Sequence, residues 1–140
     1  MENKTKPEHA ILEIPKPWDT VTVKYAIELC RNRGYLTLAK RLLDAQDKLP
    51  KSWVFDGCSH WFNSYRGHPI YEVCFFHDCE YLVGGTEAQR LMADYDLGKG
   101  LVAMTGSVEF SEITFTGVRV GGEAAWKKNF SWGYGYQSEK

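Results

Sequence analysis

Two helical patterns meet at a short glycine turn in the middle of the chain, and this junction limits the possible folds most strongly. The first pattern covers about residues 70–82 and ends at two glycines, residues 84–85, which commonly terminate helices. Thr86 and Gln89 form a capping-box pattern for a second helix, which we expect to stop near Gly98. Because the connection is so short, the two helices should be antiparallel neighbours. The sequence therefore predicts a mainly α-helical core.

The first helix carries residues that can perform chemistry. Cys74, His77 and Tyr81 are spaced by three and four residues, so they share one side of the helix. His77 and Asp78 are adjacent and point about 100° apart, because a helix has 3.6 residues per turn. They can therefore serve neighbouring sub-sites but cannot usefully bond each other.

The second helix offers two aspartates as partners for this histidine. Antiparallel packing can bring Asp94 opposite His77, but Asp96 is only two residues further along. The two aspartates point about 200° apart on a helix. Only one of them can therefore face His77.

Composition and charge exclude several classes of protein. The chain has 140 residues, which is the size of one domain, and its 17 basic residues are balanced by 18 acidic ones. It contains no basic stripe, so nucleic acid is not expected as a partner. No apolar stretch approaches the roughly 18 residues that span a bilayer, and the first residues lack the apolar region of a secretory signal. We therefore expect a chain that is made in the cytoplasm without a transmembrane segment.

The N-terminal part of the chain predicts an arm and two helices. Residues 1–18 contain three prolines and should form an extended arm. A helix is expected from Asp19 or Thr20, either of which can cap it, to Gly34. Residues 35–49 form an amphipathic pattern that is typical of a helix facing the core.

The segment of residues 51–69 has no periodic pattern and is expected to be a long loop, which in a compact domain is often functional. Two of its aromatic residues, Trp61 and Phe62, have two interpretations. They either pack the loop onto the protein body or reach into substrate or membrane.

Residues 99–140 are the least clear part. Apolar residues between 107 and 120 have a strand-like composition, but their alternation slips twice. Ser107 can instead cap a helix, and we favour a helix to about Thr116, mainly because the family resemblance described next implies a helical core. The aromatic segment 132–135 is expected to be an irregular tail laid over the body.

The motifs of the central region together resemble the phospholipase A2 superfamily. Three segments carry the resemblance: Cys74-x-x-His77-Asp78-x-x-Tyr81 is similar to the active-site helix, Asp56-Gly57-Cys58 to the calcium loop of bacterial members, and Arg90-x-x-x-Asp94 to the helix that follows. The resemblance covers roughly residues 55–97. It implies one phospholipase A2-like domain over residues 1–140, with two antiparallel helices and a metal-binding loop as its core.

The resemblance also implies a catalytic mechanism. His77 would be the general base that takes a proton from water, and Asp94 would accept a hydrogen bond from its other ring nitrogen. The arginine spacing favours Asp94 over Asp96. Tyr81 would orient the aspartate. The implied reaction is hydrolysis of phospholipid acyl esters, with a phospholipid or a membrane surface as the partner.

The same resemblance implies calcium as the cofactor. Asp56, Asp78 and a backbone carbonyl near Gly57 would bind it, because calcium prefers carboxylate and carbonyl oxygens. A disulfide between Cys58 and Cys74 would tie the calcium loop to the helix. Neither the disulfide nor a millimolar calcium site suits a reducing cytosol. We therefore hypothesise that the protein acts after release or delivery, for example in a virion.

Two alternatives remain open. Cys58, His60, Cys74 and His77 provide two thiolates and two imidazoles, a chemically sound zinc site, although Cys-x-His is tighter than the usual spacing. The chain could also be a catalytically silent phage or bacterial structural protein of the same fold. The remaining cysteine of the central helix, Cys79, is either an unpaired thiol or pairs with Cys30.

Overall fold

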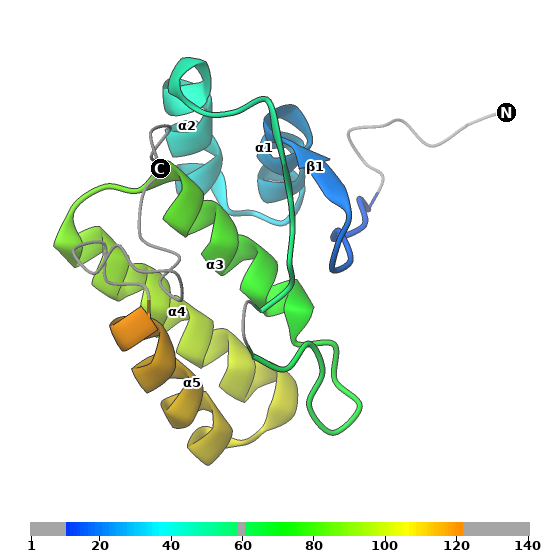
Figure 1. Ribbon diagram of the computed structural model, residues 1–140, viewed down its shortest axis with the longest axis vertical. Coiled ribbons are helices and arrows are strands. Elements are labelled where there is room, and N and C mark those ends of the chain that lie inside the picture. Colours follow the sequence, from blue (N-terminus) through cyan, green and yellow to red (C-terminus); the bar gives the residue numbers. More distant parts are fainter. Residues whose placement is uncertain (1–10, 59–60, 122–140) are drawn as a thin grey trace, which may run out of the picture.

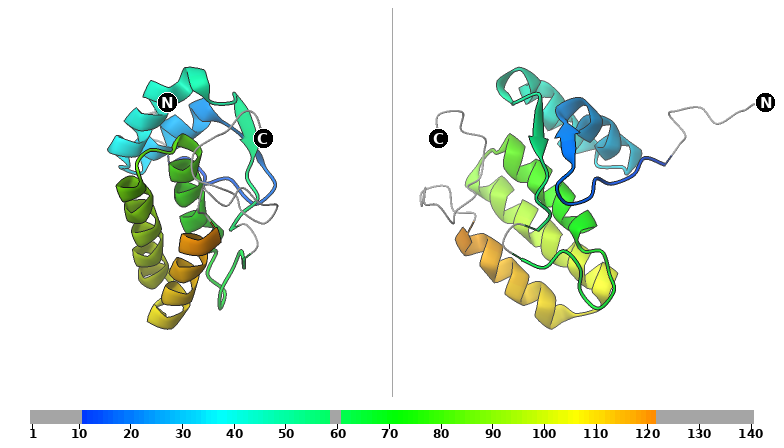
Figure 2. Two further views of the ribbon diagram at one scale, coloured as in Figure 1. Left: turned by 60° about the vertical axis from the view of Figure 1, so that its left-hand side comes forward. Right: turned by 45° about the vertical axis from the view of Figure 1, so that its right-hand side comes forward.

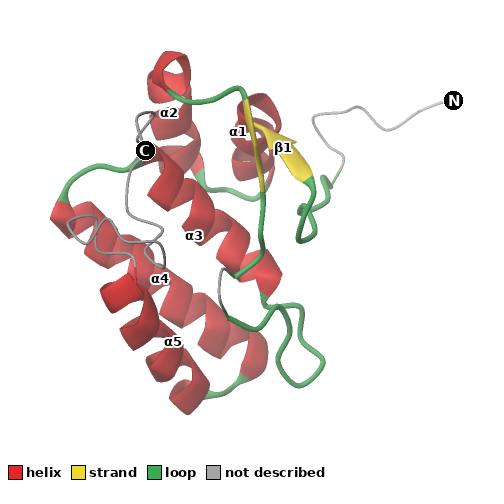
Figure 3. Cartoon of the chain, viewed as in Figure 1, coloured by secondary structure: helices red, strands yellow, loops and turns green. Residues whose placement is uncertain are grey.

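The computed structural model describes residues 11–58 and 61–121, and these residues are mainly helical (Figure 3). The elements in chain order are β1 (Thr20–Thr22), α1 (Val23–Asn32), α2 (Leu36–Ala45), the short 3-10 helix η2 (Gln46–Lys48), β2 (Ser52–Val54), α3 (Tyr71–Val83), α4 (Glu87–Thr105) and α5 (Val108–Gly121). The mainly helical class predicted from the sequence is confirmed. Of the predicted extended arm, residues 11–16 form neither helix nor strand.

The start of the first helix differs from the prediction. Residues Thr20–Thr22 form β1, which pairs antiparallel with β2 so that Val21 lies opposite Trp53. Helix α1 begins only at Val23, and the Thr22 hydroxyl caps it by accepting a hydrogen bond from the Tyr25 amide. Both strands have three residues, too few for a visible alternation of apolar and polar side chains. The prediction of a helix start at Asp19 or Thr20 was therefore wrong.

Helices α1 and α2 form a layer that covers one end of α3 (Figure 1). Leu38 and Leu42, one turn apart on α2, are buried, whereas Leu36 and Leu43 are exposed. The apolar side of α2 packs into a cluster that also holds Phe75 of α3. This part of the fold confirms the second predicted helix.

Helices α3 and α4 are antiparallel neighbours, as the glycine turn predicted, and α5 lies along α4 (Figures 1 and 2). Thr86 and Gln89 form the expected capping box. However, α4 continues through Gly98 to Thr105, so the predicted stop near Gly98 was wrong.

The glycines of α4 permit close helix packing. A Cβ atom on Gly98 would lie 3.2 Å from the Ser111 hydroxyl of α5, which donates a hydrogen bond to the Gly98 carbonyl. A Cβ on Gly100 would lie 2.7 Å from a methyl group of Val73 on α3. These two glycines therefore let α4 approach α3 on one side and α5 on the other.

The C-terminal helix resolves the ambiguous segment. Residues 108–121 are helical, and the Ser107 hydroxyl accepts a hydrogen bond from the Phe110 amide. The preference for helix over strand was correct, although the helix runs five residues beyond Thr116. The aromatic tail at 132–135 lies outside the described residues.

Buried apolar side chains form two clusters, one under α1 and α2 and one between α3, α4 and α5. Cys30 and Cys79 meet inside the first cluster as free, buried thiols. Of the two options for Cys79, the unpaired thiol is therefore the one observed. Among the described helices, none is long and apolar enough to cross a membrane.

Candidate functional site

The His77 ring of α3 faces the Asp94 carboxylate of α4. Its Nε2 atom lies 2.7 Å from Asp94 Oδ1, and the Asp94 side chain is fully buried. Asp96 points outward, and its side chain is 58% exposed beside Lys99. Antiparallel packing therefore brings Asp94 opposite His77 as expected, and of the two aspartates the one favoured by the arginine spacing is the one that faces the ring.

Three further polar groups surround Asp94. Tyr81 donates its hydroxyl proton to Asp94 Oδ1 at 2.7 Å, and Arg119 Nη1 donates to Oδ2 at 2.7 Å. Burial opposes the charge of Asp94, but the hydrogen bonds from His77, Tyr81 and Arg119 outweigh it and hold the pKa of this carboxyl below its ordinary value. Arg90 is buried and lies 3.7 Å from Oδ2. Asp94 is therefore held as a carboxylate.

The charge of Asp94 fixes the position of the histidine proton. An ionised carboxylate can only accept hydrogen bonds, so Nε2 of the neutral His77 ring carries the proton. The lone pair of the neutral ring is then on Nδ1. This nitrogen can take a proton from a water molecule or a substrate.

Asp78 occupies a separate position, beside the loop that carries Asp56. Its Oδ2 atom accepts a hydrogen bond from Trp53 Nε1 at 3.0 Å. Burial raises the pKa of Asp78 to about 7; the Trp53 hydrogen bond opposes this shift and the charge of Asp56 adds to it. No lysine or arginine of the described residues forms an ion pair with Asp78.

The Asp56–Cys58 loop is tied to α3 by a disulfide between Cys58 and Cys74. Gly57 has a φ of +73°, and a Cβ atom there would lie 2.1 Å from Asn63 Oδ1. That Asn63 oxygen accepts a hydrogen bond from the Cys58 amide at 2.9 Å. The predicted disulfide is thus present, and the turn at Gly57 requires glycine both for its φ and for space.

A largely apolar cavity of about 500 Å³ opens over these residues. His77 and Asp78 lie in its wall together with Gly57 and the disulfide. Helix α5 forms much of the rest, through the residues Ile113, Thr114, Gly117, Val118, Val120 and Gly121, and Trp61 adds an aromatic surface. The polar groups of the site therefore face a space that suits an apolar chain.

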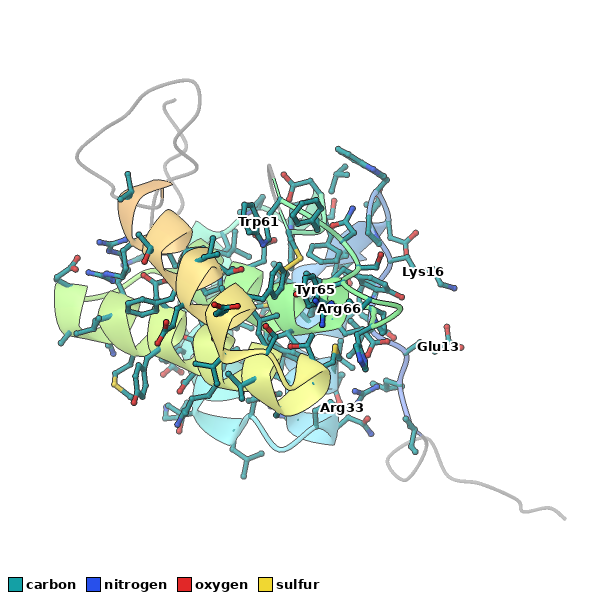
Figure 4. The ribbon with its side chains drawn as sticks, turned by 90° about the horizontal axis from the view of Figure 1, so that it is seen from below. Glu13, Lys16, Arg33, Trp61, Tyr65 and Arg66 are labelled. Carbon is teal, nitrogen blue, oxygen red and sulfur yellow. A yellow bond between two sulfur atoms is a disulfide. The ribbon has the colours of Figure 1, made fainter. Side chains whose placement is uncertain are left out.

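The loop after the disulfide packs its aromatic rings on α5. Tyr65 stacks on Phe110 with ring centroids 3.9 Å apart, and Trp61 stacks on the same ring at 6.0 Å. Figure 4 shows Trp61 and Tyr65 beside the disulfide. Phe62 is 59% exposed. Packing on the protein body is therefore observed for Trp61, which also lines the cavity, whereas contact of these aromatics with substrate or membrane stays a prediction.

The zinc alternative loses its thiolates in this structure. Cys58 and Cys74 are bonded to each other, so neither sulfur is available as a thiolate ligand. His60 lies outside the described residues. Within residues 11–58 and 61–121, no three His, Cys, Asp or Glu side chains converge as a metal-binding group.

Three residues of the site were not predicted from the sequence. Trp53 and Asn63 come from the segment without periodicity, and Arg119 comes from a segment whose helical structure was uncertain. Arg119 is a charged residue between two valines, whereas Trp53 and Asn63 lie in mixed sequence that gave no signal. Their partners are 25, 5 and 25 residues away in the chain, which local patterns do not reveal.

Comparisons of the chain with models of protein families, with curated proteins and with solved structures found no match.

Proposed function

We propose that the chain is a calcium-dependent esterase of the phospholipase A2 type, which hydrolyses phospholipid acyl esters with a water molecule activated by His77. The observation that supports this function best is the His77–Asp94 pair at the wall of an apolar cavity, with the Asp78 carboxylate beside it. A base, a negatively charged ligand and an apolar binding space are the three parts that such a reaction needs.

In the proposed reaction, Nδ1 of His77 removes a proton from water as the water attacks the ester carbonyl. Asp94 stabilises the resulting imidazolium and keeps the ring oriented, and the Tyr81 hydroxyl fixes Asp94 Oδ1. His77 then returns the proton to the departing alcohol. A serine nucleophile is not required.

The residues beside the dyad fit a calcium ion. Asp78 lies in the repulsive field of Asp56 with no cationic partner among the described residues, an arrangement that a divalent cation would relieve. Asp56, Asp78 and a backbone carbonyl near Gly57 would hold the ion, which prefers such oxygen ligands. When bound, calcium would neutralise the substrate phosphate and polarise the ester carbonyl.

The apolar cavity supports an acyl chain as the substrate group. Its wall is formed mostly by carbon-rich side chains of α5 and by Trp61. Ile113 and Val120 in this wall are 60% and 49% exposed. Exposed apolar side chains at the mouth of a cavity are typical of a surface that meets lipid.

The function is tested by measuring fatty-acid release from mixed phospholipid vesicles, using protein with its disulfide intact. We expect release at millimolar calcium and none when EDTA removes the ion. If the oxidised protein releases no fatty acid in calcium, the catalytically silent alternative replaces this proposal.

Substitution of Phe62 tests whether the aromatic loop contacts the membrane. Replacing this exposed ring by glutamine should lower fatty-acid release from vesicles about tenfold, because it removes apolar area from the lipid contact. Release from a soluble short-chain phospholipid should change less than about twofold.

The matched control for this variant is Leu36→Gln, which changes a residue on α2 that is 65% exposed and does not line the cavity. It should leave both rates unchanged. Equal losses on vesicles and on the soluble substrate for Phe62→Gln would contradict a role in membrane contact.

A further inference from the structure

The two oxygens of the Asp94 carboxylate have different partners. Oδ1 accepts from Tyr81 and contacts His77 Nε2, both at 2.7 Å. Oδ2 accepts from Arg119 Nη1, also at 2.7 Å. Arg90 Nη1 lies further from the same oxygen, at 3.7 Å. Arg119 therefore provides the close contact to the oxygen that the histidine does not use.

Arg119 comes from α5, the helix that also forms the cavity wall. Neighbouring residues Val118 and Val120 line the cavity, while the guanidinium group of Arg119 turns away to α4. Its second nitrogen lies 2.5 Å from Glu87 Oε2, at the beginning of α4. One side chain of α5 thus contacts both Glu87 and Asp94, which lie about two turns apart on α4.

We propose that Arg119 is a positioning residue, which holds Asp94 in the rotamer that faces His77 and does so only when α5 is seated against α4. Because this inference rests on the proposed function, it specifies how the same site is assembled. The catalytic pair and the acyl-chain cavity then form together, since one helix supplies the cavity wall and the contact to Asp94.

The physical reason lies in the rotation of a carboxylate. A carboxyl group held at one oxygen can still turn about its Cβ–Cγ bond, because such terminal torsions are broad. A charge-assisted hydrogen bond from a guanidinium group to the second oxygen restricts that turn. Without Arg119, Oδ1 would spend part of its time away from Nε2. Small losses of alignment at a catalytic base are costly in rate.

Steady-state kinetics on a soluble short-chain phospholipid test the inference. Arg119→Met keeps the apolar stem and should lower kcat about tenfold while KM changes less than about twofold. Arg119→Lys retains a charge near Oδ2 and should recover part of kcat. An unchanged kcat in Arg119→Met, at full disulfide content, would overturn the proposal.

Arg41→Met is the matched control for a structural effect. Arg41 also joins two helices, by an ion pair to Glu80 at 2.7 Å, and its side chain is 22% exposed against 24% for Arg119. It does not line the cavity that contains His77 and Asp78. We expect a similar loss of thermal stability in both variants but a normal kcat only in Arg41→Met. Equal losses of kcat would assign Arg119 a structural role alone and overturn the proposal.

A spectroscopic measurement separates this inference from the proposed function. Nitrogen-15 chemical shifts of the His77 ring, measured where the ring is neutral, should report a proton on Nε2 in the wild-type protein. Arg119→Met should give a mixture of the two tautomers, whereas Arg41→Met should match the wild type. The same single tautomer in all three proteins would overturn the positioning role. Absent turnover in the wild type would count only against the proposed function, because this measurement needs no substrate.

Discussion

Asp78→Asn is expected to abolish calcium-dependent fatty-acid release and, at the same time, to stabilise the calcium-free protein. An amide cannot replace the charge that binds a hard cation, so activity at millimolar calcium should fall by a factor of about 1000 or more. The amide retains an oxygen that can accept the hydrogen bond from Trp53. The variant therefore removes the half-buried charge while it preserves the local packing.

The stabilisation follows from the raised pKa of Asp78. Burial raises its pKa to about 7 in the folded protein from an ordinary value of 3.8, so the folded state favours the neutral acid. The contribution of Asp78 to the stability of the calcium-free wild type should therefore become less favourable as the pH rises from about 4 to 7. At pH 8, the free energy of unfolding of Asp78→Asn should be about 2 kcal/mol higher than that of the wild type. This is roughly half of the free energy that corresponds to the full pKa shift, because the side chain is only partly buried and solvent screens its charge.

Chemical denaturation at pH 4 and pH 8, with EDTA, measures this effect. Two results should appear together: a gap between variant and wild type at pH 8, and a smaller gap at pH 4. Calcium should raise the unfolding temperature of the wild type and leave that of the variant unchanged. If Asp78→Asn is less stable than the wild type at pH 8, the surroundings of Asp78 do not disfavour its charged form, and the prediction is wrong.

Removing the disulfide is expected to lower the stability of the protein and weaken its response to calcium. Cys58 and Cys74 close a loop with a sequence separation of 16, for which chain entropy gives about 3 kcal/mol of stability. The double variant Cys58→Ser/Cys74→Ser should lose about that free energy of unfolding. It should also need more calcium for half-maximal activity, because the Asp56 loop is no longer fixed to α3.

The contribution of the disulfide to stability is measured by comparing the proteins with and without a reducing agent. Dithiothreitol should bring the wild type to the stability of the double serine variant and should have no effect on that variant. Cys30→Ala/Cys79→Ala removes the two free thiols and should remain sensitive to reduction. If reduced and oxidised wild-type protein have equal activity at micromolar calcium, the hypothesis of action after release from a reducing compartment fails.

The parts of the site that the sequence predicted are those set by local geometry. Helix spacing places His77 and Tyr81 on one side of α3, and the Thr86 capping box sets the start of α4. They bring Asp94 within reach of His77, and the arginine spacing of the family resemblance favoured Asp94 over Asp96. These relations depend on residues within one or two turns of helix, so a sequence pattern can express them.

The parts that the sequence did not predict depend on tertiary contacts. Gly98 resembles a helix terminator but lies inside α4, where the close approach of Ser111 favours a residue without a side chain. Strands β1 and β2 are stabilised by pairing with each other, not by their own composition. Arg119 reaches Asp94 only because α5 packs along α4. Each of these outcomes depends on a partner that is distant in the chain.

The central claim is that His77 activates the attacking water in a calcium-dependent hydrolysis. Its most direct test is the initial rate of fatty-acid release by His77→Ala and by the wild type, at millimolar calcium and with the disulfide intact in both. We expect the variant to lose at least about a thousandfold in rate while calcium still raises its unfolding temperature, because Asp56 and Asp78 are unchanged. Equal rates in the two proteins would contradict the proposed role of His77.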